Sequence, residues 1–85
     1  MASLDNLRSE IDDIDHAIID LLARRLRICA DVARIKAETG STVIQPARVR
    51  DVLSTRRQWA IDQGVDADFA EHLFRTLLAE THRIE

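Results

Sequence analysis

Residues that interrupt helices are scarce in this chain of 85 residues, which contains two glycines and one proline. Glycine and proline are the strongest local breaks in a helical pattern. Aliphatic residues are plentiful and runs of β-branched residues are absent, which suits helices better than strands. The two glycines and one proline leave room for two breaks, so the sequence predicts an all-α protein with a single domain, residues 1–85.

Other scarcities exclude classes of function. The single cysteine, Cys29, excludes an internal disulfide and is expected to be a small buried side chain. A net charge of -3 argues against general nucleic-acid or membrane binding. No apolar run is long enough to span a bilayer, and Met1-Ala2-Ser3 leads directly into a charged amphipathic segment without the features of a signal peptide. We expect a cytoplasmic protein.

The chain also lacks the usual catalytic motifs. Its histidines, His16, His72 and His82, are far apart and form no metal-ligand pattern, which argues against zinc. It has no glycine-rich phosphate loop, nucleophile elbow or Cys/His pair. No metal or cofactor is expected, and His82 is expected at the surface.

The dominant pattern is an apolar stripe between Leu4 and Lys36. Its residues follow one another at spacings of 4, 3, 4, 3, 7, 4 and 3, which is a helical period. They are Leu7, Ile11, Ile14, Ile18, Leu21, Ile28, Val32 and Ile35. Because no glycine or proline occurs from Leu4 to Glu38, the sequence predicts one helix roughly 50 Å long, ended by Gly40.

Local signals delimit all three predicted helices. Ser3 or Asp5 can cap the N-terminus of the long helix. Pro46 suits the first turn of a second helix, which Gly64 ends. Asp66 caps a third helix that runs to the C-terminus. The prediction is one long helix followed by two shorter ones.

The predicted long helix is too long for a compact chain of this size. A globule of 85 residues has a radius of gyration of about 12 Å and is roughly 30 Å across. The helix must therefore extend beyond its own domain, with its stripe facing water. A second copy that packs its long helix against the first would bury the stripe, so we predict an obligate homodimer.

Arg25 occupies the slot that would divide the spacing of 7 into 4 and 3. An arginine within an apolar stripe loses hydration unless it meets an anionic group. A salt bridge to an acidic side chain and a guanidinium that reaches water are both possible. A ligand anion is the third possibility.

Three further cations can join Arg25. Lys36 lies on the same side of the helix, about 16 Å along the axis. Arg8 lies about 25 Å from Arg25 on the same helix, so only the partner's Arg8 can approach, if the two long helices run antiparallel. Arg48 is in the first turn of the second helix. This cluster suits a small dianionic substrate, because guanidinium groups pair with carboxylates through two hydrogen bonds. Arginine is abundant here, however, so some clustering is expected without function.

The whole chain, without gaps, resembles the small all-helical chorismate mutases. The matching segments are Leu7-Arg8 with Ile11, Ile14-Asp15, Leu21-Leu22-Ala23-Arg24-Arg25, Ile35-Lys36, Arg48, and Asp66-x-x-Phe69 with Leu73-Phe74. The resemblance implies an intertwined homodimer of three-helix chains with active sites shared between subunits. It also implies the rearrangement of chorismate to prephenate without a cofactor.

The resemblance implies roles for the cations. Arg25 would bind one substrate carboxylate and the partner's Arg8 the other. Lys36 would bind a carboxylate and the ether oxygen whose bond breaks. Arg48 would give electrostatic support nearby.

Further residues have roles implied by the same resemblance. Thr81 would help to hold a carboxylate, and Val32 and Leu78 would form apolar walls. Glu85 would face the ether oxygen as a protonated acid, because a carboxylate cannot donate a hydrogen bond. The implied catalytic residues are therefore Lys36, Glu85 and Arg25.

Two positions depart from the typical family pattern and open further reactions. Gln45 and Val49 stand where typical members have acidic residues that contact the ring hydroxyl. Val49 resembles the isochorismate-pyruvate lyases. Val43-Ile44-Gln45-Pro46 with Glu80-Thr81-x-Arg83-x-Glu85 resembles the branch acting on 4-amino-4-deoxychorismate. These two activities, a non-catalytic helical dimerisation module and activation by a partner enzyme all stay open.

Overall fold

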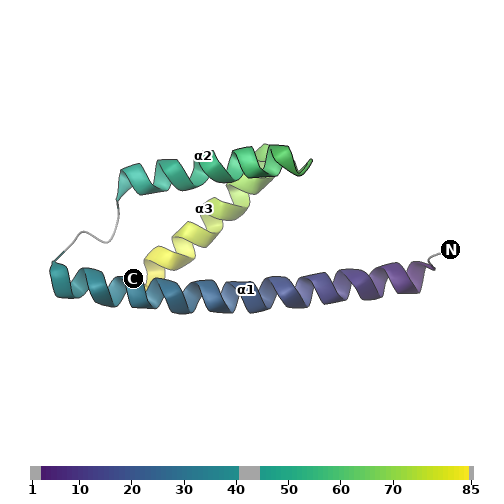
Figure 1. The fold of residues 1–85 in the computed structure, drawn as a ribbon, viewed down its shortest axis with the longest axis horizontal. Helices are drawn as coiled ribbons and strands as arrows, with labels where there is room; N and C mark the ends of the chain where they lie inside the picture. Colours follow the sequence, from purple (N-terminus) through teal and green to yellow (C-terminus); the bar gives the residue numbers. More distant parts are fainter. Residues whose placement is uncertain (1–2, 41–44, 85) are drawn as a thin grey trace.

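A computed structural model describes residues 3–40 and 45–84, and these form three α-helices (Figure 1). They are α1 (Leu4–Thr39), α2 (Pro46–Asp62) and α3 (Ala67–Ile84). The predicted all-α class is confirmed, as is the order of one long helix and two shorter ones.

Capping groups set these boundaries as the sequence predicts. The Ser3 side chain accepts a hydrogen bond from the Asn6 N–H at 3.1 Å and so caps α1. Gly40 ends α1 in the left-handed region, at φ 73°. The Asp66 carboxylate accepts from the Phe69 N–H at 2.8 Å before α3 begins. Each cap satisfies backbone groups that have no partner within the helix.

The turn between α2 and α3 depends on Gly64, which has φ 73°. The Gly64 N–H donates to the Ile61 carbonyl at 3.1 Å, and the Val65 N–H donates to the Ala60 carbonyl at 2.8 Å. This pair of bonds is the Schellman motif. It stops α2 and lets the chain turn back towards α1.

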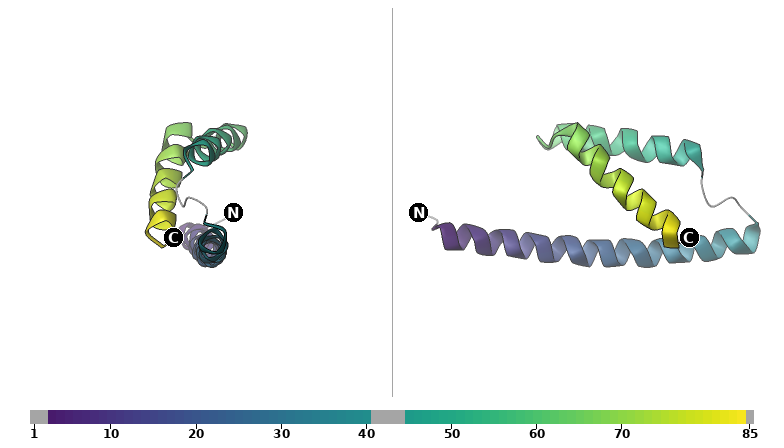
Figure 2. Two further views of the ribbon diagram at one scale, coloured as in Figure 1. Left: turned by 90° about the vertical axis from the view of Figure 1, so that its left-hand side faces the viewer. Right: turned by 180° about the vertical axis from the view of Figure 1, so that it is seen from behind.

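The small core lies between α2 and α3. Its buried apolar residues are Val52, Leu53, Ala60 and Ala70, and α1 contributes no buried residue. α3 runs from the end of α2 back to α1, so that it bridges the other two helices (Figure 2). The contact between α3 and α1 thus connects the long helix with the α2–α3 core.

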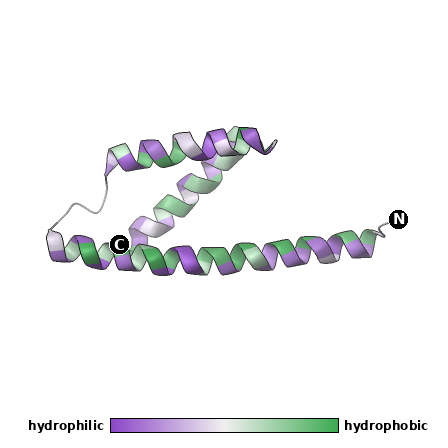
Figure 3. Cartoon of the chain, in the orientation of Figure 1, coloured by the Kyte–Doolittle hydropathy of each residue, from purple (hydrophilic) through white to green (hydrophobic). Residues whose placement is uncertain are grey.

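The apolar stripe of α1 is exposed in the single chain. All eight stripe residues are exposed, from 38% for Val32 to 61% for Leu21, and hydrophobic positions recur along the helix (Figure 3). The radius of gyration is 16.3 Å and the longest extent 57 Å, which confirms the predicted overhang. No helix among the described residues is both long and apolar enough to cross a membrane.

Gly64→Ala is expected to destabilise the protein. The space around a Cβ at this position is open, so the cost is that of a left-handed backbone, roughly 1–2 kcal/mol. Gly64→Asn is the matched control and should cost less, because asparagine tolerates this conformation better. The measurement is the free energy of unfolding in urea. Equal stability of the wild type and Gly64→Ala would contradict this account of the turn.

Candidate active site

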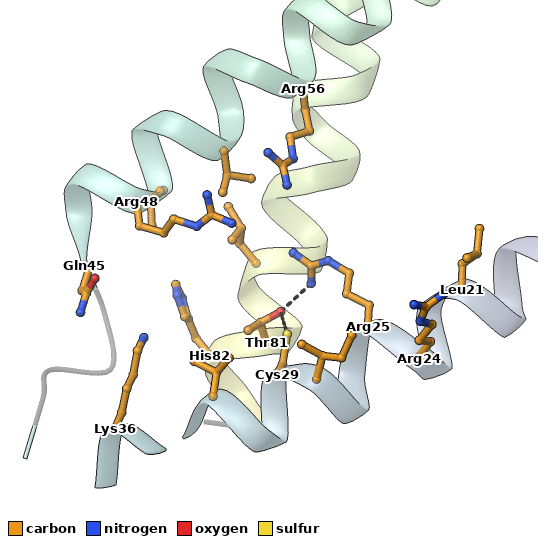
Figure 4. A pocket seen from close by; sticks show the side chains of 15 residues that line it. Leu21, Arg24, Arg25, Cys29, Lys36, Gln45, Arg48, Arg56, Thr81 and His82 are labelled. Atoms are coloured by element: carbon orange, nitrogen blue, oxygen red, sulfur yellow. Dashed lines mark hydrogen bonds between the residues drawn. The ribbon is translucent and has the colours of Figure 1, made fainter. Parts of the chain in front are cut away.

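The three helices surround a pocket of about 460 Å³ (Figure 4). It is lined by residues of all three helices and by the residue that precedes α2. They are Leu21, Arg24, Arg25, Ile28, Cys29, Val32 and Lys36 from α1; Gln45, Arg48, Val49, Val52 and Arg56; and Leu78, Thr81 and His82 from α3.

Most of the site residues predicted from the sequence lie at this one pocket. They are Arg25, Val32, Lys36, Gln45, Arg48, Val49, Leu78 and Thr81. Arg8 does not line it, because it lies in the second turn of α1, on the overhanging half of the helix. Glu85 lies outside the described residues. The structure thus brings the candidates of one chain together, and their roles stay predictions.

Arg25 turns into the pocket and is held by α3. Its Nη1 donates a hydrogen bond to the Thr81 hydroxyl at 2.8 Å, and that hydroxyl donates to the Leu77 carbonyl at 2.9 Å. The Cys29 sulfur lies 3.7 Å from the same oxygen. Thr81 is only 7% exposed. Within the described ranges Arg25 forms no salt bridge, so the acidic partner that the sequence left open is not found there.

Two guanidinium groups of α2 face Arg25 across the pocket (Figure 4). Arg48 forms an exposed ion pair with Asp51 at 3.2 Å. Such an exposed ion pair adds little to the stability of the fold. It uses one nitrogen of Arg48 and leaves the others directed at the pocket. The second group belongs to Arg56. The three guanidinium groups converge on one space.

Arg56 is fixed by aromatic rings rather than by an acid. Its Cζ lies 4.5 Å from the centroid of the Trp59 ring and 5.8 Å from that of Phe74. Its Nη1 donates to Thr55 Oγ1 at 2.8 Å, whereas its buried Nε has no hydrogen-bond partner. Burial and the like charges of Arg48 and Arg25 lower the pKa of Arg56. The side chain is therefore an incompletely compensated cation.

Sequence reasoning missed Arg56 and His82 as pocket residues. The signal for Arg56 was available, because it lies four residues after Val52 and seven after Val49, on the inner face of α2. His82 was expected at the surface, but it is half-buried and lines the pocket. Cys29, expected to be buried, is half-buried there as well.

The pocket is strongly positive. Its charged side chains within residues 3–40 and 45–84 are Arg24, Arg25, Lys36, Arg48 and Arg56, with no carboxylate among them. No cluster of metal-ligating side chains occurs in the same ranges. Opposed cations with apolar residues between them suit a small molecule that carries negative charges on a hydrocarbon frame.

The comparison with protein families agrees with this chemistry. The family described as chorismate mutase type II matches residues 7–85. The chain belongs to the type II chorismate mutase family. The match covers α1 from Leu7 onward, all of α2 and α3, and every residue that lines the pocket. It confirms the resemblance seen in the sequence.

Relatives of this chain include proteins that are named for different reactions. A 4-amino-4-deoxychorismate mutase of Streptomyces venezuelae is 33% identical over 82 residues, which are 96% of this chain and 80% of the relative. An isochorismate pyruvate lyase of Pseudomonas aeruginosa is 36% identical over 75 residues, 88% and 73% of the two chains. A T-protein of Enterobacter agglomerans is 36% identical over 85 residues, and the chain spans about a quarter of that protein, 23% of its length.

Malonate, a small dianion, is expected to raise the Tm of the chain above its value in chloride at equal ionic strength. At ten times its Kd a ligand stabilises the folded state by about 1.4 kcal/mol, which raises the Tm of a domain of this size by about 6–11 °C. Arg56→Leu should reduce that rise by at least half, because it removes a cation from the pocket.

Arg50→Leu is the control for Arg56→Leu. It removes the same charge from the same helix, and Arg50 is an exposed residue that does not line this pocket. Thermal unfolding of the three proteins in malonate and in chloride provides the comparison. If Arg56→Leu and Arg50→Leu retain the same malonate response, Arg56 does not contribute to anion binding.

Proposed function

We propose that the protein is a homodimeric chorismate mutase, which rearranges chorismate to prephenate without a cofactor. The observation that supports this most is the convergence of Arg25, Arg48 and Arg56 on one pocket without a lining carboxylate among the described residues. Chorismate carries two carboxylates on a small ring, which matches a pocket with opposed cations and apolar walls.

Two features of α1 support the homodimer. Its eight stripe residues are 38–61% exposed, so covering them with a second copy would yield roughly half of the 1.5–3 kcal/mol that full burial of each side chain gives. Arg8 and Arg25 are about 25 Å apart along one helix, so they cannot bind the same small molecule within one subunit. With the two long helices antiparallel, the partner's Arg8 would complete the site near Arg25 and Lys36.

The proposed mechanism needs no nucleophile. The rearrangement is intramolecular and pericyclic, so the protein must hold the enolpyruvyl arm over the ring and stabilise negative charge on the ether oxygen. Arg25 and the partner's Arg8 would bind the carboxylates. Lys36 and a protonated Glu85 would face the ether oxygen, with Arg48 as electrostatic support.

Thr81 and the uncharged walls would position the substrate. Thr81 holds the Arg25 guanidinium at 2.8 Å, so it would act on a carboxylate through that group as well as directly. Val32 and Leu78 line the pocket as apolar side chains. They would contact the hydrocarbon part of the ring and exclude water.

Gln45 and Val49 favour a second candidate function. These residues line the pocket near the start of α2, and neither carries a negative charge. The corresponding reactions are those named for the relatives in Streptomyces venezuelae and Pseudomonas aeruginosa. The same pocket would then rearrange 4-amino-4-deoxychorismate or eliminate pyruvate from isochorismate.

A panel of chorismate, isochorismate and 4-amino-4-deoxychorismate tests these proposals. Separation of the products shows which substrate is consumed and by which reaction. We expect turnover of at least one substrate and saturable binding of a bicyclic dicarboxylate that mimics the transition state. A protein that consumes none of the three and does not bind the analogue would be a non-catalytic dimerisation module.

Arg25→Ala is expected to lower kcat/KM for the preferred substrate by roughly 10²–10³-fold, because it removes a preorganised cation from the transition state. The protein should remain folded, since Arg25 is only half-buried and forms one hydrogen bond across the pocket. Steady-state kinetics and circular dichroism provide the two measurements.

Arg34→Ala is the matched control for Arg25→Ala. It removes the same charge from α1, where Arg34 is exposed and pairs with Asp31 at 3.2 Å. Its kcat/KM should remain within twofold of the wild-type value, as expected of an exposed pair. An unchanged kcat/KM for Arg25→Ala would refute the proposed site.

A further inference from the structure

Hydrogen-bond acceptors are scarce at this pocket. Guanidinium and ammonium groups donate hydrogen bonds but cannot accept them. Apart from the weakly accepting Cys29 sulfur, the side-chain acceptors among the described pocket residues are Gln45, Thr81 and His82. A ligand that carries a donor group on its ring therefore has few possible partners here.

Two of these acceptors are already engaged. Thr81 Oγ1 accepts from Arg25 and donates to the Leu77 carbonyl, and Gln45 takes part in an intramolecular interaction. The His82 imidazole is different, because it makes no hydrogen bond or ion pair within residues 3–40 and 45–84. It is half-buried, so part of its hydration is lost without a replacement from the chain.

The His82 ring points into the pocket from the last turns of α3, beside Thr81 and on the side of Lys36 (Figure 4). Val49 and Val32 line the pocket on the facing helices and offer no polar atom. A neutral imidazole has one nitrogen that accepts and one that donates. Its position gives the pocket an acceptor that is not already engaged within the described residues.

The three candidate substrates differ in the donor that their ring presents. Chorismate and isochorismate carry a hydroxyl on different ring carbons, and 4-amino-4-deoxychorismate carries an amino group. The cations of the pocket suit the two carboxylates that all three share, so binding of the carboxylates does not by itself distinguish the rings. To distinguish the three substrates, the pocket needs a group that forms a hydrogen bond with the donor on the ring.

We propose that His82 accepts a hydrogen bond from the ring hydroxyl or amino group of the substrate and thereby determines which ring is preferred. This inference rests on the proposed function, since it assigns a specificity role within the same site. A pocket built to hydrogen-bond a donor disfavours a ligand that lacks it, because the acceptor is then left unpaired in a partly desolvated place.

The test compares His82→Val and His82→Gln with the wild type on the preferred substrate and on its O-methyl or N,N,N-trimethylammonium analogue, which has no hydrogen-bond donor on the ring. His82→Val removes the acceptor, and His82→Gln retains one. We expect His82→Val to lower kcat/KM for the preferred substrate roughly tenfold, the effect of one lost hydrogen bond in a partly buried site. His82→Gln should recover most of this loss, and on the methylated analogue His82→Val should equal the wild type.

His72→Val is the matched control, because His72 is an exposed histidine on the same helix outside the pocket. It should leave kcat/KM unchanged on both substrates. The inference is wrong if His82→Val has the same kcat/KM as the wild type on the preferred substrate. It is also wrong if the substitution lowers kcat/KM by the same factor on the methylated analogue. In both cases the proposed function stands. If the wild type consumes none of the three substrates, the proposed function fails and the inference with it.

Discussion

The apolar stripe of α1 is the constraint on which the rest of the structure depends. The core of one chain lies between α2 and α3, and α1 adds no buried residue to it. The eight stripe residues are 38–61% exposed, so covering them would yield roughly half of the 1.5–3 kcal/mol that full burial of each side chain gives. The sum is comparable to the usual stability of a whole domain, about 5–15 kcal/mol. Folding and pairing of two chains should therefore be coupled.

The same helix connects this constraint with the chemistry of the pocket. Its C-terminal half places Arg25 and Lys36 beside α2 and α3, whereas its N-terminal half carries Arg8 away from the pocket. A helix that only supported a core would not need to be this long. In the proposed antiparallel homodimer, this length would instead supply one pocket with cations from both halves of the helix, contributed by two copies.

The cations are held in place before any ligand binds. Thr81 fixes Arg25 through a hydrogen bond of 2.8 Å, and the Trp59 ring lies 4.5 Å from Arg56. Preorganised charge stabilises a transition state without reorganisation during the reaction. Mutual repulsion of these groups and the unpaired Nε of Arg56 destabilise the empty pocket. The arrangement therefore lowers the stability of the free protein, which is the effect expected of a pocket that binds an anion.

Local signals in the sequence were sufficient to predict the helices. Gly40, Gly64 and Asp66 determine the ends of helices through their own backbone or side chain, without the rest of the fold. Arg25 was recognisable because it interrupts a regular stripe. These features depend on residues that are close in sequence, which explains why the structure confirms them.

The pocket partners depend on tertiary packing and were harder to predict. Arg56 and His82 reach the pocket because α2 and α3 cross at an angle that places these faces towards α1 (Figures 1 and 4). Sequence periodicity gives the face of a helix but not the direction in which that face points. The role proposed for Arg8 requires a second copy of the chain, and Glu85 lies outside the described residues, so both roles stay predictions.

Complementation between two inactive variants tests the shared site most directly. Arg8→Ala and Arg25→Ala proteins are mixed in equal amounts, unfolded and refolded together, and assayed on the substrate that the wild type consumes. With random pairing half of the dimers are mixed, and each mixed dimer has one intact site, so roughly a quarter of wild-type activity should return. A refolded mixture as inactive as its two parents, although it is dimeric, would contradict the claim that each site combines Arg25 with the partner's Arg8.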